Sequence, residues 1–125
     1  MDLLVNVSVG ELLDKISILE IKSERINDAK KLENVMKELD ILSKIATENL
    51  AGCKDWIKKI KEINEKLWVI EDDIRQKERD KAFDNEFIEL ARAVYYTNDL
   101  RFKIKDEINS FYGSNIKEQK SYENY

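Results

Sequence analysis

The stretch NEKLWVIEDDIRQKE, residues 64–78, decides how this chain folds. Leu67, Ile70 and Ile74 recur every three or four residues, which is the spacing of one face of an α-helix. Beside this apolar row runs a second row, which comprises Asn64, Trp68, Glu71, Arg75 and Glu78. The segment therefore predicts a packed helix with a charged row at the margin of its buried face.

Similar periodicity extends over the rest of the chain, and each helical segment has its own start signal. Ser8 and Glu11 form a capping box, while Asp28 and Asp84 are predicted N-caps for later helices. Gly113 is a predicted C-cap. Helices are predicted over about 9–26, from 29 to an end between 49 and 52, over 54–79, and from about 87 to 112.

The composition favours a few long helices. The 125 residues contain no Pro and only three Gly, the two residues that most often interrupt regular structure. We expect an all-α fold, an antiparallel helical bundle of about four helices with a long C-terminal helical hairpin. Residues 1–112 are the predicted bundle domain and 113–125 a polar tail. The tail is predicted either to be disordered or to fold back and close a pocket.

Charge and rare residues restrict the function classes. The net charge of −4 argues against nucleic acid as the main partner, because phosphate binding needs a basic surface. The chain has no His, which excludes the Ser-His-Asp and Cys-His systems and His-ligated zinc. A single Cys, no signal-peptide pattern and no apolar run of membrane length predict a cytoplasmic protein that does not insert into a membrane.

Arg101 draws attention to a candidate site, because it occupies a position in the apolar stripe of the last predicted helix. A buried Arg needs a partner, since an unpaired buried charge is strongly unfavourable. In an antiparallel hairpin Glu71 should face Arg92 or Tyr95, and Asn64 should lie near Arg101. The candidate ligand-binding residues are Glu20, Lys22, Asn64, Glu71, Arg75, Glu78, Glu89, Arg92, Asn98, Arg101 and Lys105.

Three interpretations of these polar residues remain open. They form a buried ionic network that fixes helix register, a pocket whose cations bind an anionic ligand, or a carboxylate site for a hard metal ion. For the third, EFIELARAVYY is similar to the magnesium-binding Glu-x-x-Asp helix of helical nucleotide pyrophosphatases. Arg92 stands where that pattern, counted from Glu89, requires Asp. No metal site or catalytic residue is therefore assigned.

Four strings together resemble a family of small bacterial and phage proteins called domain of unknown function 6165. They are VSVGELLDKISILEIKSERI, NEKLWVIEDDIRQKE, FIELARAVYYTNDLRFKIKDEIN and GSNIKEQKSYENY. The resemblance covers nearly the whole chain except residues around 28–58. It implies recurring polar positions at Gly10, Glu11, Asp14, Lys15, Glu20, Lys22, Asn64, Glu71, Asp72, Arg75, Glu78, Glu89, Arg92, Asn98, Asp99, Arg101, Lys105, Lys120, Ser121 and Tyr122. It also implies an association with surface-polysaccharide assembly.

The expected function is binding of a small phosphorylated or carboxylated ligand, a class that includes nucleotide sugars. The protein is expected to be a homodimeric binding or accessory protein. One alternative is an enzyme in the same pocket, either a metal-dependent nucleotide pyrophosphohydrolase or a chorismate-mutase-like catalyst. Another is a structural helical partner protein whose charges only set register. The cofactor, if there is one, is unknown from the sequence.

Overall fold

A computed structural model describes all residues, 1–125, and contains four helices and no strand. They are α1 (Val9–Arg25), α2 (Ala29–Asn49), α3 (Cys53–Arg79) and α4 (Asn85–Tyr112). The predicted all-α fold is confirmed, and every predicted helix boundary lies within three residues of the observed one.

Local side-chain contacts explain why the helices begin and end where they do. Ser8, Asp28 and Asp84 each accept a hydrogen bond from the backbone N–H three residues further on, at 3.1, 2.9 and 3.0 Å. These bonds satisfy N–H groups that have no partner inside the helix. At the other end of α4, Gly113 adopts a left-handed conformation with φ of 66°, which glycine tolerates without a Cβ clash.

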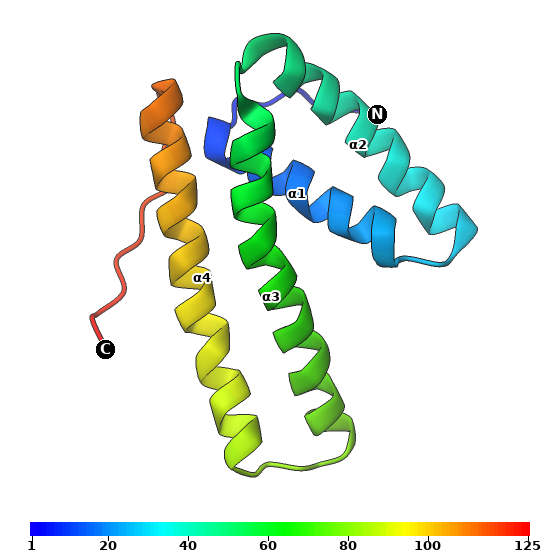
Figure 1. The fold of residues 1–125 in the computed structure, drawn as a ribbon, viewed down its shortest axis with the longest axis vertical. Helices are drawn as coiled ribbons and strands as arrows, with labels where there is room; N and C mark the ends of the chain where they lie inside the picture. Colours follow the sequence, from blue (N-terminus) through cyan, green and yellow to red (C-terminus); the bar gives the residue numbers. More distant parts are fainter.

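The helices form two antiparallel pairs (Figure 1). α3 and α4 make a long hairpin, and the shorter α1–α2 pair lies obliquely across its upper half. α1 packs against all three other helices, whereas α2 packs mainly against α1. The lower half of the hairpin extends beyond α1 and α2, and the tail runs back along α4. The junction of α1 with the hairpin is therefore the one place where three helices meet.

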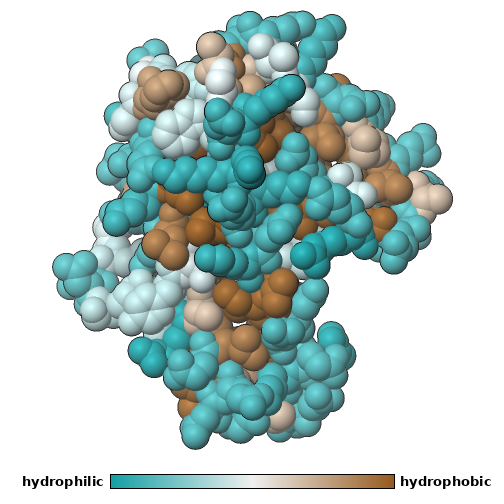
Figure 2. All heavy atoms as spheres, in the orientation of Figure 1, coloured by the Kyte–Doolittle hydropathy of each residue, from teal (hydrophilic) through white to brown (hydrophobic).

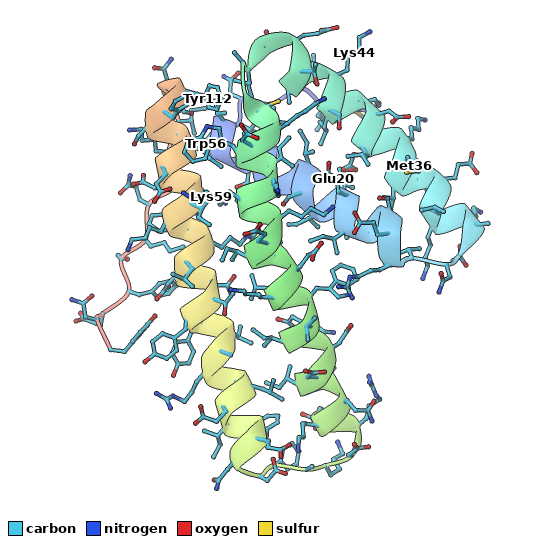
Figure 3. All side chains as sticks on the ribbon, viewed as in Figure 1. Glu20, Met36, Lys44, Trp56, Lys59 and Tyr112 are labelled. Carbon is cyan, nitrogen blue, oxygen red and sulfur yellow. The ribbon has the colours of Figure 1, made fainter.

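The hydrophobic core fills this junction. Its fully buried members come from all four helices and are Leu13, Ile16, Ala46, Cys53, Ile57, Ile60, Ile104 and Ile108. Trp56 and Tyr112 lie together at the upper end of the hairpin (Figure 3), where the Tyr112 hydroxyl donates to the carbonyl oxygen of Ala51 at 2.7 Å. Apolar side chains also reach the surface along the lower half of the hairpin (Figure 2).

Candidate functional site

A buried polar cluster lies next to this core, and the carboxylate of Asp14 is at its centre. The Asp14 side chain is 1% exposed. Arg101 of α4 donates from Nε to Asp14 Oδ1 at 3.0 Å and from Nη2 to Oδ2. Asn64 of α3 donates from its amide nitrogen to Asp14 Oδ1 at 2.8 Å and to Ser17 Oγ at 2.7 Å. One carboxylate of α1 thus joins α1, α3 and α4.

Lys105 extends the cluster one turn further along α4. Its side chain is 7% exposed, and Nζ lies 2.7 Å from Glu11 Oε2 and 3.9 Å from Asp14 Oδ2. A tail carboxylate, Glu118, lies 3.2 Å from the same nitrogen. Burial by itself lowers the pKa of Lys105, but the bond to Glu11 and the charge of Asp14 outweigh burial and raise it. The bond to Asp14 likewise raises the pKa of Arg101. Both cations are therefore held in their charged forms.

A close helix approach sets the position of this cluster. The backbone N–H of Gly10 donates to Asn109 Oδ1 at 2.6 Å. A Cβ added at Gly10 would lie 2.7 Å from the carbonyl oxygen of Lys105, closer than real Cβ atoms come. Only glycine lets the start of α1 lie this near the backbone of α4. The approach brings Glu11 and Asp14 within reach of the two cations.

Beside the buried cluster the three helices enclose a groove of about 520 Å³. We call it the crossing groove; its lining residues are Ile18, Ile21, Asn64, Leu67, Trp68, Glu71, Asp72, Arg75, Asn98 and Arg101. The Arg101 side chain is 29% exposed, and its Nη1 makes no hydrogen bond to the protein. The groove thus combines apolar side chains, the carboxylates of Glu71 and Asp72, and a guanidinium edge that has no protein partner.

Five of the eleven residues predicted from the sequence line this groove: Asn64, Glu71, Arg75, Asn98 and Arg101. Lys105 belongs to the buried cluster. The other five lie outside the groove and are Glu20, Lys22, Glu78, Glu89 and Arg92. Glu20 lies 3.6 Å from Lys61, and Glu78 lies 3.2 Å from Lys81.

The predicted facing of Glu71 and Arg92 is not what the structure contains. Glu71 accepts from Arg75 Nε at 3.2 Å, and Arg92 Nη1 lies 3.4 Å from Glu89. Each charge pairs with a neighbour three or four residues away on its own helix, because such neighbours are in reach without any inter-helix approach. The expected nearness of Asn64 and Arg101 is confirmed, since both bind Oδ1 of Asp14.

Asp14, the centre of the buried cluster, is the residue that the spacing arguments missed. The sequence does carry a signal for it: Gly10, Asp14, Ser17 and Ile21 recur at intervals of four, three and four, so they share one helix face. All four are buried. A carboxylate inside such a row requires a cation on a neighbouring helix, and Arg101 is that cation.

The tail adopts the folded-back arrangement rather than projecting away from the bundle. Lys120 Nζ lies 5.4 Å from the centre of the Phe102 ring. The Tyr125 ring packs on Tyr95 and Tyr96, with ring centres 5.3 and 4.6 Å apart. The Tyr125 hydroxyl donates to Asp99, and this bond raises the pKa of Tyr125 to about 12. Tail and α4 together enclose a second hollow of about 890 Å³.

Neither a metal centre nor a membrane span is evident in these helices. No group of three or more Cys, Asp or Glu side chains lies close enough together to hold a metal ion. Glu86, near the Glu-x-x-Asp-like segment, pairs with Lys77 at 2.8 Å instead. None of the four helices combines the length and the apolarity that crossing a membrane requires.

Fold and site together define a small all-α protein in which an ionic cluster joins three helices beside an open groove. The chain belongs to a family of unknown function, DUF6165, whose model matches residues 3–125. The resemblance seen in the sequence is thereby confirmed, and the match includes the tail. No curated protein and no solved structure matches the chain.

Proposed function

We propose that this protein binds a small anionic ligand, phosphorylated or carboxylated, in the crossing groove. The observation that carries the proposal is the state of Arg101. Asp14 occupies its Nε and Nη2, while Nη1 is left without a protein partner at the wall of the groove. A guanidinium held in this way presents a fixed donor edge to a phosphate or a carboxylate.

The surroundings of Arg101 supply the other parts of a ligand site. Asn98 lines the groove, and its side-chain amide has no hydrogen-bond partner in the protein. Arg75 adds a second, exposed guanidinium, whose Nε is bound by Glu71, and Asp72 adds a further carboxylate. Trp68 with Ile18 adds apolar surface. A volume of about 520 Å³ falls in the range of small-molecule sites. The groove therefore offers charge, hydrogen bonds and apolar contact in one place.

The same cluster could serve helix packing alone, and a conservative variant separates the two roles. Arg101→Lys keeps a cation next to Asp14 but removes the Nη1 edge. We expect the variant to lose affinity for an anion by about tenfold or more, because hydrogen bonds to charged groups contribute about 1.5–3 kcal/mol. Isothermal titration calorimetry with uridine diphosphate and with succinate measures the change.

Arg92→Lys is the matched control, because Arg92 lies on the same helix but does not line the groove. It should bind both probes as the unmodified protein does. Urea unfolding of each variant checks that stability is retained. If Arg101→Lys binds the probes as tightly as Arg92→Lys, the anion does not use Arg101, and the ionic cluster serves packing only.

We also propose that the protein works in the cytoplasm as a homodimer joined through the exposed face of α4 that carries Tyr96 and Leu100. Its one cysteine is unpaired and buried, which suits a reducing compartment. Tyr96 and Leu100 are four residues apart on α4, so they lie on one face, and each is more than two-fifths exposed. Two neighbouring apolar side chains of this kind offer a surface that a second copy of the chain can remove from water.

Leu100→Glu tests the dimer. Light scattering coupled to size-exclusion chromatography should give twice the chain mass of 14.8 kDa for the unmodified protein and the single mass for the variant. A buried carboxylate in an apolar interface is the physical reason for the loss. Ile45→Glu, on an exposed position of α2, is the control and should remain dimeric. A single mass for the unmodified protein at high concentration would contradict the proposal.

A further inference from the structure

The crossing groove and the hollow under the tail are neighbours, because Asn98 lines both. This residue lines the crossing groove, the hollow under the tail, and a narrow gap of about 30 Å³. Arg101 lines both the groove and the gap, while Phe102 and Lys120 line both the gap and the hollow. The guanidinium edge of Arg101 and the hollow beneath the tail are thus separated only by this narrow gap and the side chains that line it.

The hollow under the tail differs chemically from the groove. Its walls are aromatic and come from both α4 and the tail: Tyr95, Phe102, Tyr122 and Tyr125. Figure 2 shows side chains of intermediate hydropathy gathered where the tail lies beside α4. The polar groups between these rings are the amides of Asn98 and Asn124, the carboxylates of Asp99 and Glu123, and the ammonium of Lys120.

This set of groups suits a sugar ring better than a second anion. A sugar presents C–H groups that pack on aromatic faces, and hydroxyls that both donate and accept hydrogen bonds. Carboxylates accept from such hydroxyls, and amides do both. Asp99 and Glu123 would repel a phosphate, since one Lys120 does not balance two carboxylates. The partner-free Nη1 of Arg101 at one end and the aromatic rings at the other thus orient a ligand with its anion at Arg101 and its neutral ring under the tail.

From this geometry we infer that the ligand of the crossing groove is a glycosyl phosphate or a nucleoside diphosphate sugar, whose sugar ring binds beneath the tail against Tyr122 and Phe102. The inference rests on the proposed anion site and adds the ligand class. Lys120 fixes the tail in this place, because its Nζ lies 5.4 Å from the Phe102 ring centre and 5.5 Å from that of Tyr122. The ion pair between Glu118 of the tail and Lys105 of α4 is a second contact that holds the tail on α4.

Calorimetric titration of the full chain tests the inference with paired probes. Uridine diphosphate is compared with uridine diphosphate hexoses (glucose, galactose and N-acetylglucosamine), and inorganic phosphate with the hexose 1-phosphates. We expect at least one hexose form to bind about tenfold more tightly than its sugar-free anion, since a well-packed aromatic contact with hydrogen bonds contributes on the order of 1–2 kcal/mol. Tyr122→Ala should remove this gain and leave the affinity for the sugar-free anion within about twofold.

Two variants sharpen the result. Tyr122 is 79% exposed, so its truncation does not disturb the core. Tyr122→Phe retains the ring and should keep most of the hexose gain, whereas Arg101→Lys should weaken binding of hexose and sugar-free probes alike. If the anions bind but the hexose adds nothing, or if Tyr122→Ala keeps the gain, the inference is wrong and the anion site stands. If no probe binds the unmodified protein, both are overturned.

Discussion

Asp14→Asn is expected to lower the free energy of unfolding by about 3–5 kcal/mol, the loss that follows removal of one partner from a buried ion pair. The substitution keeps the size of the side chain but removes its charge. Arg101 then loses the carboxylate that binds its Nε and Nη2, and Lys105 keeps only Glu11 and Glu118. Urea unfolding followed by circular dichroism measures the change at constant m-value.

Glu38→Gln is the matched control for this prediction. It makes the same change of carboxylate to amide in an ion pair between α1 and α2, where Glu38 lies 3.0 Å from Lys15. Both side chains are well exposed, so the expected loss is below about 1 kcal/mol. The double variant Asp14→Asn/Arg101→Gln should be less destabilised than the sum of its single changes by about 1 kcal/mol or more.

An Asp14→Asn variant as stable as Glu38→Gln would contradict the claim that the Asp14 carboxylate stabilises the packing of α1 on the hairpin. It would mean that Arg101 finds an equal partner elsewhere, and that the crossing of α1 over the hairpin does not depend on the pair. The tail pairing of Lys105 with Glu118 would then be the contact to examine next.

Gly10→Ala has the second-largest expected effect, a loss of about 2–4 kcal/mol of unfolding free energy. The new Cβ would lie 2.7 Å from the carbonyl oxygen of Lys105 and 3.0 Å from Asn109 Oδ1. A backbone carbonyl inside a helix cannot move aside as a flexible side chain does. The start of α1 must therefore withdraw, which breaks the 2.6 Å bond from the Gly10 N–H to Asn109.

The sign of the change in unfolding free energy distinguishes a clash at Gly10 from an unobstructed helix. In an unobstructed helix the same change stabilises by up to about 1 kcal/mol, since alanine is the better helix former. Gly113→Ala is the comparison at a glycine with nothing within 4 Å of the added Cβ. Its left-handed φ of 66° gives a strain of about 1–2 kcal/mol without any clash. A stable Gly10→Ala protein would mean that α1 is free to shift on α4.

Much of the architecture could be predicted from local sequence. Each helix start depends on a side chain that bonds a backbone N–H three residues away, as Ser8, Asp28 and Asp84 do. Such contacts form within one turn, so the residues that make them are visible in the linear sequence. The hairpin of α3 and α4 follows from two long apolar stripes and a short turn. An antiparallel hairpin with this turn also predicts that Asn64 lies close to Arg101.

The sequence by itself therefore determined the four helices, their antiparallel hairpins and the need of Arg101 for a partner. The tertiary structure decided that this partner is Asp14, 87 residues earlier, and that Glu71 and Arg92 each pair within their own helix. Periodicity shows which face of a helix is buried but not which helix covers it or at what angle. Two tertiary features therefore set the position of the site. They are the oblique crossing of α1, which Gly10 allows, and the return of the tail along α4.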